Sequence, residues 1–201
     1  SRRYPTPWQS IGARGVNNLS SALLLSLLPP NAPFFRLVID EAEKKKMEAV
    51  DPRIKTEVES SLADIERAVA REIEVNNIRV STFEALRHLI VTGNALIYLP
   101  DKGDMRVIHL DRYIVKRDPM GHAQCIIMKE TVSPAVLPEE LKEYVETGLA
   151  EYEDTCDVFT KQHILPDGKI EIVQEVKGRI IEETRQIFPR DRSPFIALRM
   201  L

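Results

Sequence analysis

The chain contains little cysteine. Cys125 and Cys156 are the two cysteines among 201 residues, and neither belongs to a C-x-x-C pair. This spacing favours neither a zinc ribbon nor a disulfide framework. The cysteine usage fits a reducing compartment best.

The chain also lacks a long hydrophobic run. The longest apolar cluster, Ala22 to Leu28, contains Ser26 and ends at Pro29-Pro30, well short of the roughly 18 residues that span a bilayer. The amino end, SRRYPTPW, has no initiator Met and no signal-peptide layout, and the carboxyl end, SPFIALRML, stops inside an apolar run. We therefore expect a piece of a longer polypeptide without a membrane segment.

Positive charge is not in excess. Lys and Arg number 28 against 31 Asp and Glu, which gives a net charge of -3. A strongly basic face cannot be inferred from this balance, so a tight, nonspecific DNA binder is disfavoured.

The common catalytic motifs are missing as well. We find no Walker-type phosphate loop, no G-x-G-x-x-G turn, no G-x-S-x-G elbow and no H-E-x-x-H pair, and neither cysteine has a base beside it in sequence. The sequence therefore predicts no catalytic residue, no metal and no cofactor, and a protein that is not an enzyme.

Apolar residues, 43% of the chain, suffice for one sizeable domain or two small ones that share a core. The first predicted helix runs from Thr6-Pro7-Trp8 to the stop at Pro29-Pro30. One of its faces carries Trp8, Ile11, Val16, Leu19, Leu23 and Leu27, and a second carries Leu24, Leu25 and Leu28. A helix that is apolar on two faces must pack against more than one neighbour.

The next segments predict a strand and two helices. Phe34 to Ile39 is rich in β-forming residues and indicates a strand, which a charged helix follows. Asp51-Pro52 caps and starts a long amphipathic helix that ends at Asn76-Asn77. Its apolar face repeats at steps of three or four residues: Ile54, Val58, Leu62, Ile65, Val69 and Ile73.

The stretch from Ser81 to Pro100 changes the character of the chain. Ser81 and Glu84 form a capping box that starts a helix, with Val80 placed to staple against Ala85. Gly93 suits a left-handed C-terminal cap, so the helix should stop near Thr92. The apolar run Ala95 to Leu99 then predicts a strand covered on both faces, so this stretch is a structural hinge between two layers.

After Leu99 the periodicity becomes two, and turn signals separate short strands. The predicted strands are Met105 to Leu110, Tyr113 to Arg117, Ala123 to Glu130, Asp157 to Leu165, Ile170 to Val176, Ile180 to Ile187 and Phe195 to Leu201. A helix near residues 138–148 and an acidic linker, Glu151 to Asp154, interrupt them. The predicted fold class is α+β: a mainly helical part over 1–94 and an antiparallel β-rich part over 95–201, a meander or small barrel, in one continuous unit.

Two constellations could carry chemistry. His109 and Asp111, with Asp118 and His122 nearby, are possible metal ligands, although strand ends and turns are often rich in these residues. Arg112 and Lys116, with Ile114 on the same strand face and Arg117 beside them, could meet phosphates. A solvated strand face balanced by Asp111 and Asp118 explains the same residues.

Several long strings resemble the portal protein, or head-to-tail connector, of short-tailed bacteriophages, and they follow the family's order along nearly the whole chain. They are YPTPWQSIGARGVNNLSSALLLSLLPP (4–30), FFRL (34–37), FEALRHLIVTGNALIYLP (83–100) and YIVKRDPMG (113–121). Weaker similarities are LPEELK (137–142), DVFTKQ (157–162) and SPFIALRM (193–200).

The resemblance implies a structural subunit of a ring, commonly dodecameric, at one capsid vertex of the virion. DNA would enter through the ring during packaging and leave during ejection. The implied partners are other copies of the chain, capsid and scaffolding proteins, the terminase motor, the tail adaptor and double-stranded DNA, with assembly in the host cytoplasm. The chain would be the amino-terminal wing, in which Trp8, Ile11, Leu24 and Leu28 could pack between subunits.

Two alternatives remain open from the residues alone. A metal-dependent phosphodiesterase or nuclease fragment would use His109, Asp111, Asp118 and His122. A phage adaptor that binds nucleic acid would use Arg112, Lys116 and Arg117. In the portal interpretation, Ser81, Glu84 and Gly93 form the hinge between the helical and β-rich parts of the wing.

Overall fold

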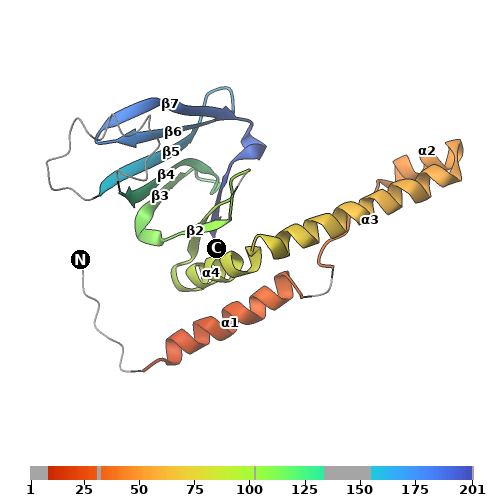
Figure 1. Ribbon diagram of the computed structural model, residues 1–201, viewed down its shortest axis with the longest axis horizontal. Helices are drawn as coiled ribbons and strands as arrows, with labels where there is room; N and C mark the ends of the chain where they lie inside the picture. The colour runs from red at the N-terminus through yellow and green to blue at the C-terminus, as the bar shows by residue number, and fades with distance from the viewer. Residues whose placement is uncertain (1–8, 31–32, 102, 134–154, 201) are drawn as a thin grey trace. The chain divides into compact units, whose positions relative to one another are not determined.

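The computed structural model describes residues 9–30, 33–101, 103–133 and 155–200. The chain divides into a helical unit that ends at Val91 and a β unit that begins at Thr92 (Figure 1). This confirms the predicted α+β class, with helices first and antiparallel strands after them. The helix predicted near 138–148 and the linker at 151–154 lie outside the described residues.

The described part of the helical unit contains four helices. They are α1 (Ile11–Leu27), α2 (Glu41–Val50), α3 (Pro52–Val75) and α4 (Ile78–Thr92). The long helix α3 starts as its sequence predicts, because the Asp51 carboxylate accepts a hydrogen bond from the Arg53 N–H (2.8 Å) and Pro52 occupies the first turn.

The prediction of a strand from Phe34 to Ile39 is wrong, because residues 33–40 form no strand. None of the strands in the described ranges pairs with this segment. Its backbone is held instead by α3, where a Glu66 carboxylate oxygen accepts the Leu37 N–H at 2.5 Å. β-forming side chains fit a pleated sheet but do not make one without a neighbouring strand.

The predicted start of α4 is also wrong. Asn77 has a positive φ of 52° that turns the chain after α3, and its carbonyl accepts the Val80 N–H at 3.0 Å. The helix therefore begins at Ile78, so that Ser81 and Glu84 lie inside it rather than at its start. Val80 is 67% exposed and does not form the expected staple. The end of α4 is confirmed: the helix stops at Thr92, and Gly93 has a φ of +70°.

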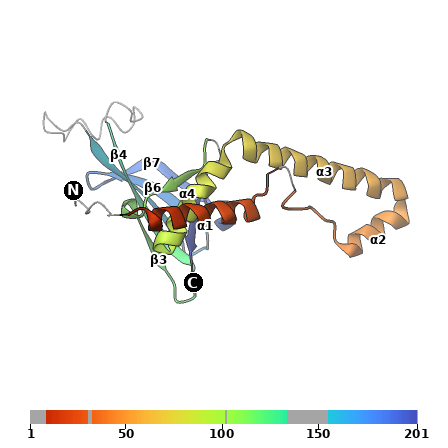
Figure 2. The ribbon, with the colours of Figure 1, turned by 90° about the horizontal axis from the view of Figure 1, so that it is seen from below.

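Helices α1 and α4 lie side by side (Figure 2). The Arg79 guanidinium of α4 donates hydrogen bonds to the carbonyls of Leu28 and Pro29, just past the end of α1. These carbonyls have no partner within α1, so Arg79 stabilises the helix end. Few side chains are enclosed: among the described residues of the helical unit, Ser20, Ala85 and Leu86 are buried.

In the residues that the structure describes, the β unit forms two antiparallel sheets. A three-stranded sheet has the order β2-β1-β8, and a five-stranded sheet is a meander in the order β3-β4-β5-β6-β7 (Figure 1). The strands are β1 (Asn94–Tyr98), β2 (Arg106–Ile108), β3 (Tyr113–Arg117), β4 (Ala123–Val132), β5 (Cys156–Ile164), β6 (Ile170–Val176), β7 (Arg179–Phe188) and β8 (Phe195–Arg199). The predicted meander is confirmed in the larger sheet.

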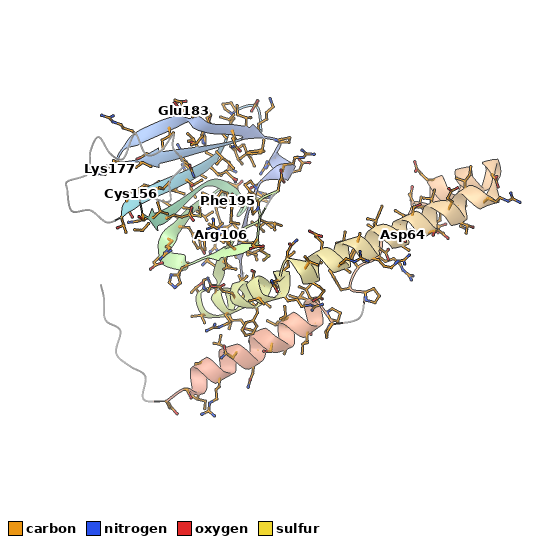
Figure 3. All side chains as sticks on the ribbon, in the orientation of Figure 1. Asp64, Arg106, Cys156, Lys177, Glu183 and Phe195 are labelled. Carbon is orange, nitrogen blue, oxygen red and sulfur yellow. The ribbon has the colours of Figure 1, made fainter. Side chains whose placement is uncertain are left out.

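Two hydrophobic clusters stabilise the β unit. The larger one joins the two sheets and contains Leu96, Ile108, Ile126, Met128 and Phe195. The smaller one, Cys156, Val158, Val176 and Ile181, lies within the five-stranded sheet. Figure 3 labels Phe195 at the start of β8 and Cys156 at the start of β5. Ala95, Leu96 and Ile97 of β1 are all buried, as predicted for a strand covered on both faces.

Strand β1 pairs with β8, which lies about a hundred residues later in the sequence. Backbone bonds extend this pairing at both ends: the Met200 N–H donates to the Gly93 carbonyl (2.8 Å), and the Leu99 N–H donates to the Pro194 carbonyl (2.7 Å). The first and last strands of the β unit therefore lie side by side.

Candidate functional site

The three candidate phosphate-facing residues occupy different environments. Arg112 is exposed in a 3-10 turn before β3, and Lys116 lies on the exposed face of β3 beside Ile114. Arg117 has the opposite strand parity and is half-buried, where its guanidinium donates to the carbonyls of Gly121 (2.9 Å) and Ala197 (3.3 Å). Arg112 and Lys116 can meet a phosphate without rearrangement, whereas Arg117 links two sheets of the β unit.

The four candidate metal ligands form two separate pairs. His109 Nδ1 lies 2.5 Å from an Asp111 carboxylate oxygen, and this hydrogen bond lowers the pKa of Asp111. Asp118 accepts hydrogen bonds from the backbone and ring of His122 and from Gln124. Burial alone raises the pKa of Asp118, but these bonds leave it lowered.

No three His, Cys, Asp or Glu side chains gather into a possible metal site in the part of the chain that the structure describes. The paired carboxylates are instead held by neighbours in their own turns. This geometry gives no support to a metal-dependent nuclease.

The candidate subunit-packing residues of α1 differ in exposure. Ile11 is 68% exposed, whereas Leu24 and Leu28 are only partly exposed. Trp8 lies outside the described residues. The structure therefore leaves Ile11 available for a neighbour, and it adds Leu19 and Leu25, which are 50% and 56% exposed.

Sequence reasoning missed a charge cluster on β6 and β7 that is built around one buried carboxylate. Glu171 is buried and accepts from the Arg185 guanidinium at 2.5 Å, and the same guanidinium makes two further bonds to Glu182. These carboxylates raise the pKa of Arg185 and the ion pair lowers that of Glu182. His163, directly across from Glu171 on β5, lies 3.5 Å from it. Glu182 lies three residues before Arg185, but only the strand pairing brings Glu171 to Arg185 and to His163, so the spacing in the sequence could not reveal the buried member of the cluster.

Arg79 was also missed. It bonds to the end of α1 and pairs with Glu74 at 2.7 Å, and its side chain is 22% exposed. A lone arginine near the start of a helix carries no sequence signal for a contact with a segment 50 residues earlier.

None of the helices in the described ranges is long and apolar enough to cross a membrane. The helical unit has many exposed apolar side chains, whereas the β unit has its own core. Exposed apolar surface of this kind is typical of a protein that packs against further protein surface. The class defined by the described residues is therefore a protein with a large apolar packing surface.

Comparison with known proteins identifies the family. The family model described as "Bacteriophage head to tail connecting protein" matches residues 1–201. The chain belongs to this family, which confirms the resemblance found in the sequence.

Among curated relatives, the portal protein of Escherichia phage T7 is 35% identical over 209 residues, which cover 100% of this chain and 39% of that protein. The portal protein of Enterobacteria phage T3 is 36% identical over 208 residues (100% and 38%), and that of Enterobacteria phage SP6 is 26% identical over 195 residues (95% and 38%). The chain thus spans well under half the length of these relatives.

Proposed function

We propose that the chain is the wing portion of a portal subunit, which assembles with other copies into a ring at one vertex of the phage capsid. The ring is the conduit for DNA packaging and ejection and the attachment point of the tail. The observation that carries this proposal is the family match along the whole chain, together with about one third identity to portal proteins.

The proposed role is structural, without catalytic activity. Its partners are further copies of the chain in a dodecameric ring, capsid and scaffolding proteins, terminase, a tail adaptor and double-stranded DNA in the channel. Assembly takes place in the host cytoplasm, and the finished ring belongs to the virion. Residues 1–94 and 95–201 act together as one continuous wing.

Two physical features support this role. The helical unit leaves apolar side chains of α1 and α3 exposed, and subunit packing would cover them. The net charge of -3 also suits a conduit, because a protein that guides DNA must not retain it by strong electrostatic attraction.

Electron microscopy and native mass measurement of the full-length protein test the proposal. We expect closed rings with a central channel and the mass of twelve copies, since the family resemblance implies a dodecamer. A protein that stays monomeric at all concentrations would rule the proposal out.

A further inference from the structure

Strand β7 lies at one edge of the five-stranded sheet. It contains ten residues and pairs with β6, and none of the described strands pairs with its other side (Figure 1). Ile180 and Ile187, near its two ends, are 51% and 55% exposed. A long edge strand with exposed β-branched side chains offers a template on which a further strand can pair. In its middle, however, β7 is not a regular strand.

The pairing of β7 with β6 contains a wide irregularity. Val173 of β6 faces residues 182–185 of β7, four residues against one, because the residue pairs on either side of this point are Ile172 with Gln186 and Gln174 with Ile181. We call residues 182–185 the β7 bulge. A bulge of two residues against one already interrupts the hydrogen-bond ladder and bends the strand. The β7 bulge is therefore a strong interruption of the sheet edge.

Thr184 closes the bulge with its side chain. Its hydroxyl oxygen accepts the Gln174 N–H at 2.9 Å, and its O–H donates to the Ile181 carbonyl at 2.7 Å. Gln174 and Ile181 lie directly opposite each other, so the hydroxyl bonds to both members of one residue pair. A side chain that bonds to nearby backbone groups in this way competes with the regular ladder. These two backbone groups are thus satisfied without a straight strand.

Arg185 holds the bulge at its other end. Its guanidinium donates to the buried Glu171 carboxylate on β6 at 2.5 Å, and to both carboxylate oxygens of Glu182 at 2.7 and 2.9 Å. The bond to Glu171 fixes the bulge to the sheet, and the bonds to Glu182 join the first and last residues of the bulge. A conformation that pulled Arg185 away would leave a buried carboxylate without its guanidinium, which stabilises the bulge against opening.

The bulge leaves little regular edge on β7. Residues 179–181 pair in register with β6 on one side of the bulge, and residues 186–188 do so on the other. Strands in globular proteins usually have about five to six residues, so neither segment is long enough to hold a further strand. Glu182 and Glu183, the latter labelled in Figure 3, are exposed within the bulge. Charges at a sheet edge oppose strand addition, because pairing would bury them.

We propose that the β7 bulge terminates the five-stranded sheet, so that no further strand pairs with the backbone of residues 182–185. The bulge thereby keeps the β units of different copies of the chain from joining edge to edge. Thr184 and Arg185 carry this stop, because their side chains hold the bulge on β6. The stop belongs to the β unit alone and would operate in any assembly of the chain, so it does not depend on the proposed portal function.

A deletion variant of the full-length protein tests the stop. Deletion of residues 182–184 removes the three extra residues, and Arg185 then lies opposite Val173 in a continuous one-to-one register. We expect this variant to shift to larger species in sedimentation velocity, with an amount that rises with protein concentration, and to gain the infrared band of intermolecular β-pairing. A folded deletion variant that keeps the size distribution of the unaltered protein would overturn the proposal.

The matched control is Glu182→Gln with Glu183→Gln. It removes the same two negative charges as the deletion but keeps the length of β7 and the Thr184 hydroxyl. We expect the control to keep the size distribution of the unaltered protein. Self-association of the control to the same extent as the deletion variant would show that charge, and not the bulge, protects the edge, and would overturn the proposal.

Cooperative urea unfolding shows whether the deletion variant is folded, because an unfolded chain would also aggregate. If the deletion prevents folding, electron cryomicroscopy of the unaltered full-length protein decides. We expect no strand beside residues 182–185, and a strand bonded to their backbone, from the same copy or another, would overturn the proposal. Failure of the unaltered protein to form rings would instead contradict the proposed function, so the two failures are distinguishable.

Discussion

The helical unit and the β unit differ in how much of their apolar surface they bury themselves. The β unit encloses two hydrophobic clusters and leaves Leu96 and Ile181 with no exposed surface. In the described part of the helical unit, Ala85 and Leu86 are the buried apolar residues, and α3 encloses none.

This difference separates two sources of stability. The β unit has a core of its own and can hold its shape by burying side chains within the chain. The helical unit has amphipathic helices whose apolar faces stay exposed among the described residues, so its stability depends on what packs against those faces. The two units thus differ in whether their stability comes from side chains buried within the described residues.

The largest expected effect is at Leu96, in the core of the β unit. Leu96→Ala removes a side chain with 0% exposure from the cluster between the two sheets, and we expect a loss of about 3 kcal/mol in the free energy of unfolding. Urea-induced unfolding measures this loss of free energy. Ile114→Ala, at a position 65% exposed on the same unit, is the control and should cost under about 0.5 kcal/mol. Equal losses for both variants would show that the β unit does not depend on its core.

Gly93→Val tests the connection between the two units. The φ of +70° at Gly93 strains a β-branched residue by about 2 kcal/mol, although no neighbouring atom lies within 4 Å of an added Cβ. We expect lower stability and a lower ring yield in the full-length protein. Gly93→Asn is the matched control and should cost less, because Asn tolerates this conformation. A normal ring yield from Gly93→Val would contradict the hinge interpretation.

Arg117 tests whether the β unit is also stabilised by polar contacts, because its guanidinium bonds to the other sheet at Ala197. Arg117→Met removes the hydrogen bonds to the Gly121 and Ala197 carbonyls, and we expect a loss of about 1 kcal/mol in urea unfolding. Lys116→Met on the exposed face of β3 should have almost no effect on stability. If only Lys116→Met weakened the fold, the assignment of Arg117 as the structural arginine would be wrong.

The smallest expected effect concerns pH. Hydrogen bonds from Lys129 (2.7 Å) and Thr131 (2.7 Å) lower the pKa of Asp157 below its ordinary value of 3.8. A carboxyl whose pKa is lowered by folding contributes stability above its unfolded pKa, and this contribution is lost as the pH falls through the folded pKa. The urea concentration at the midpoint of unfolding should therefore decrease slightly when the pH is lowered below about 4.

Asp157→Asn removes this contribution, so its urea midpoint should depend less on pH in the same window. Asp104→Asn, an exposed position in the loop before β2, is the matched control. An unchanged pH profile for Asp157→Asn would contradict the structural role of the ion pair with Lys129.

Local patterns predicted most of the elements. The bounds of β3 and β6 and the end of α4 at Thr92 agree with the prediction, because turn residues such as Gly93 leave a clear sequence signal. The prediction of a strand from Phe34 to Ile39 was wrong because a strand needs a neighbouring strand to pair with, and local composition does not reveal one. The prediction that α4 starts at Ser81 was wrong because Asn77 has a left-handed backbone that turns the chain. The helix therefore begins at Ile78.

The candidate surfaces were predictable only in part. Exposure of Ile11 and Lys116 follows from position on a helix or strand. Arg112 lies in a 3-10 turn before β3, so its predicted place on the strand face of Ile114 and Lys116 is wrong. The contacts of Arg117 and Arg79 join segments far apart in sequence. The pairing of β1 with β8 and the contact of Glu171 with Arg185 likewise depend on register. A single sequence does not contain this long-range information in a form that periodicity can recover.

The bond between the Met200 N–H and the Gly93 carbonyl has a consequence for protein engineering. It holds the first and last strands of the β unit side by side, so a short linker could join residues near Gly93 to residues near Met200. This is the geometry that permits circular permutation of a domain.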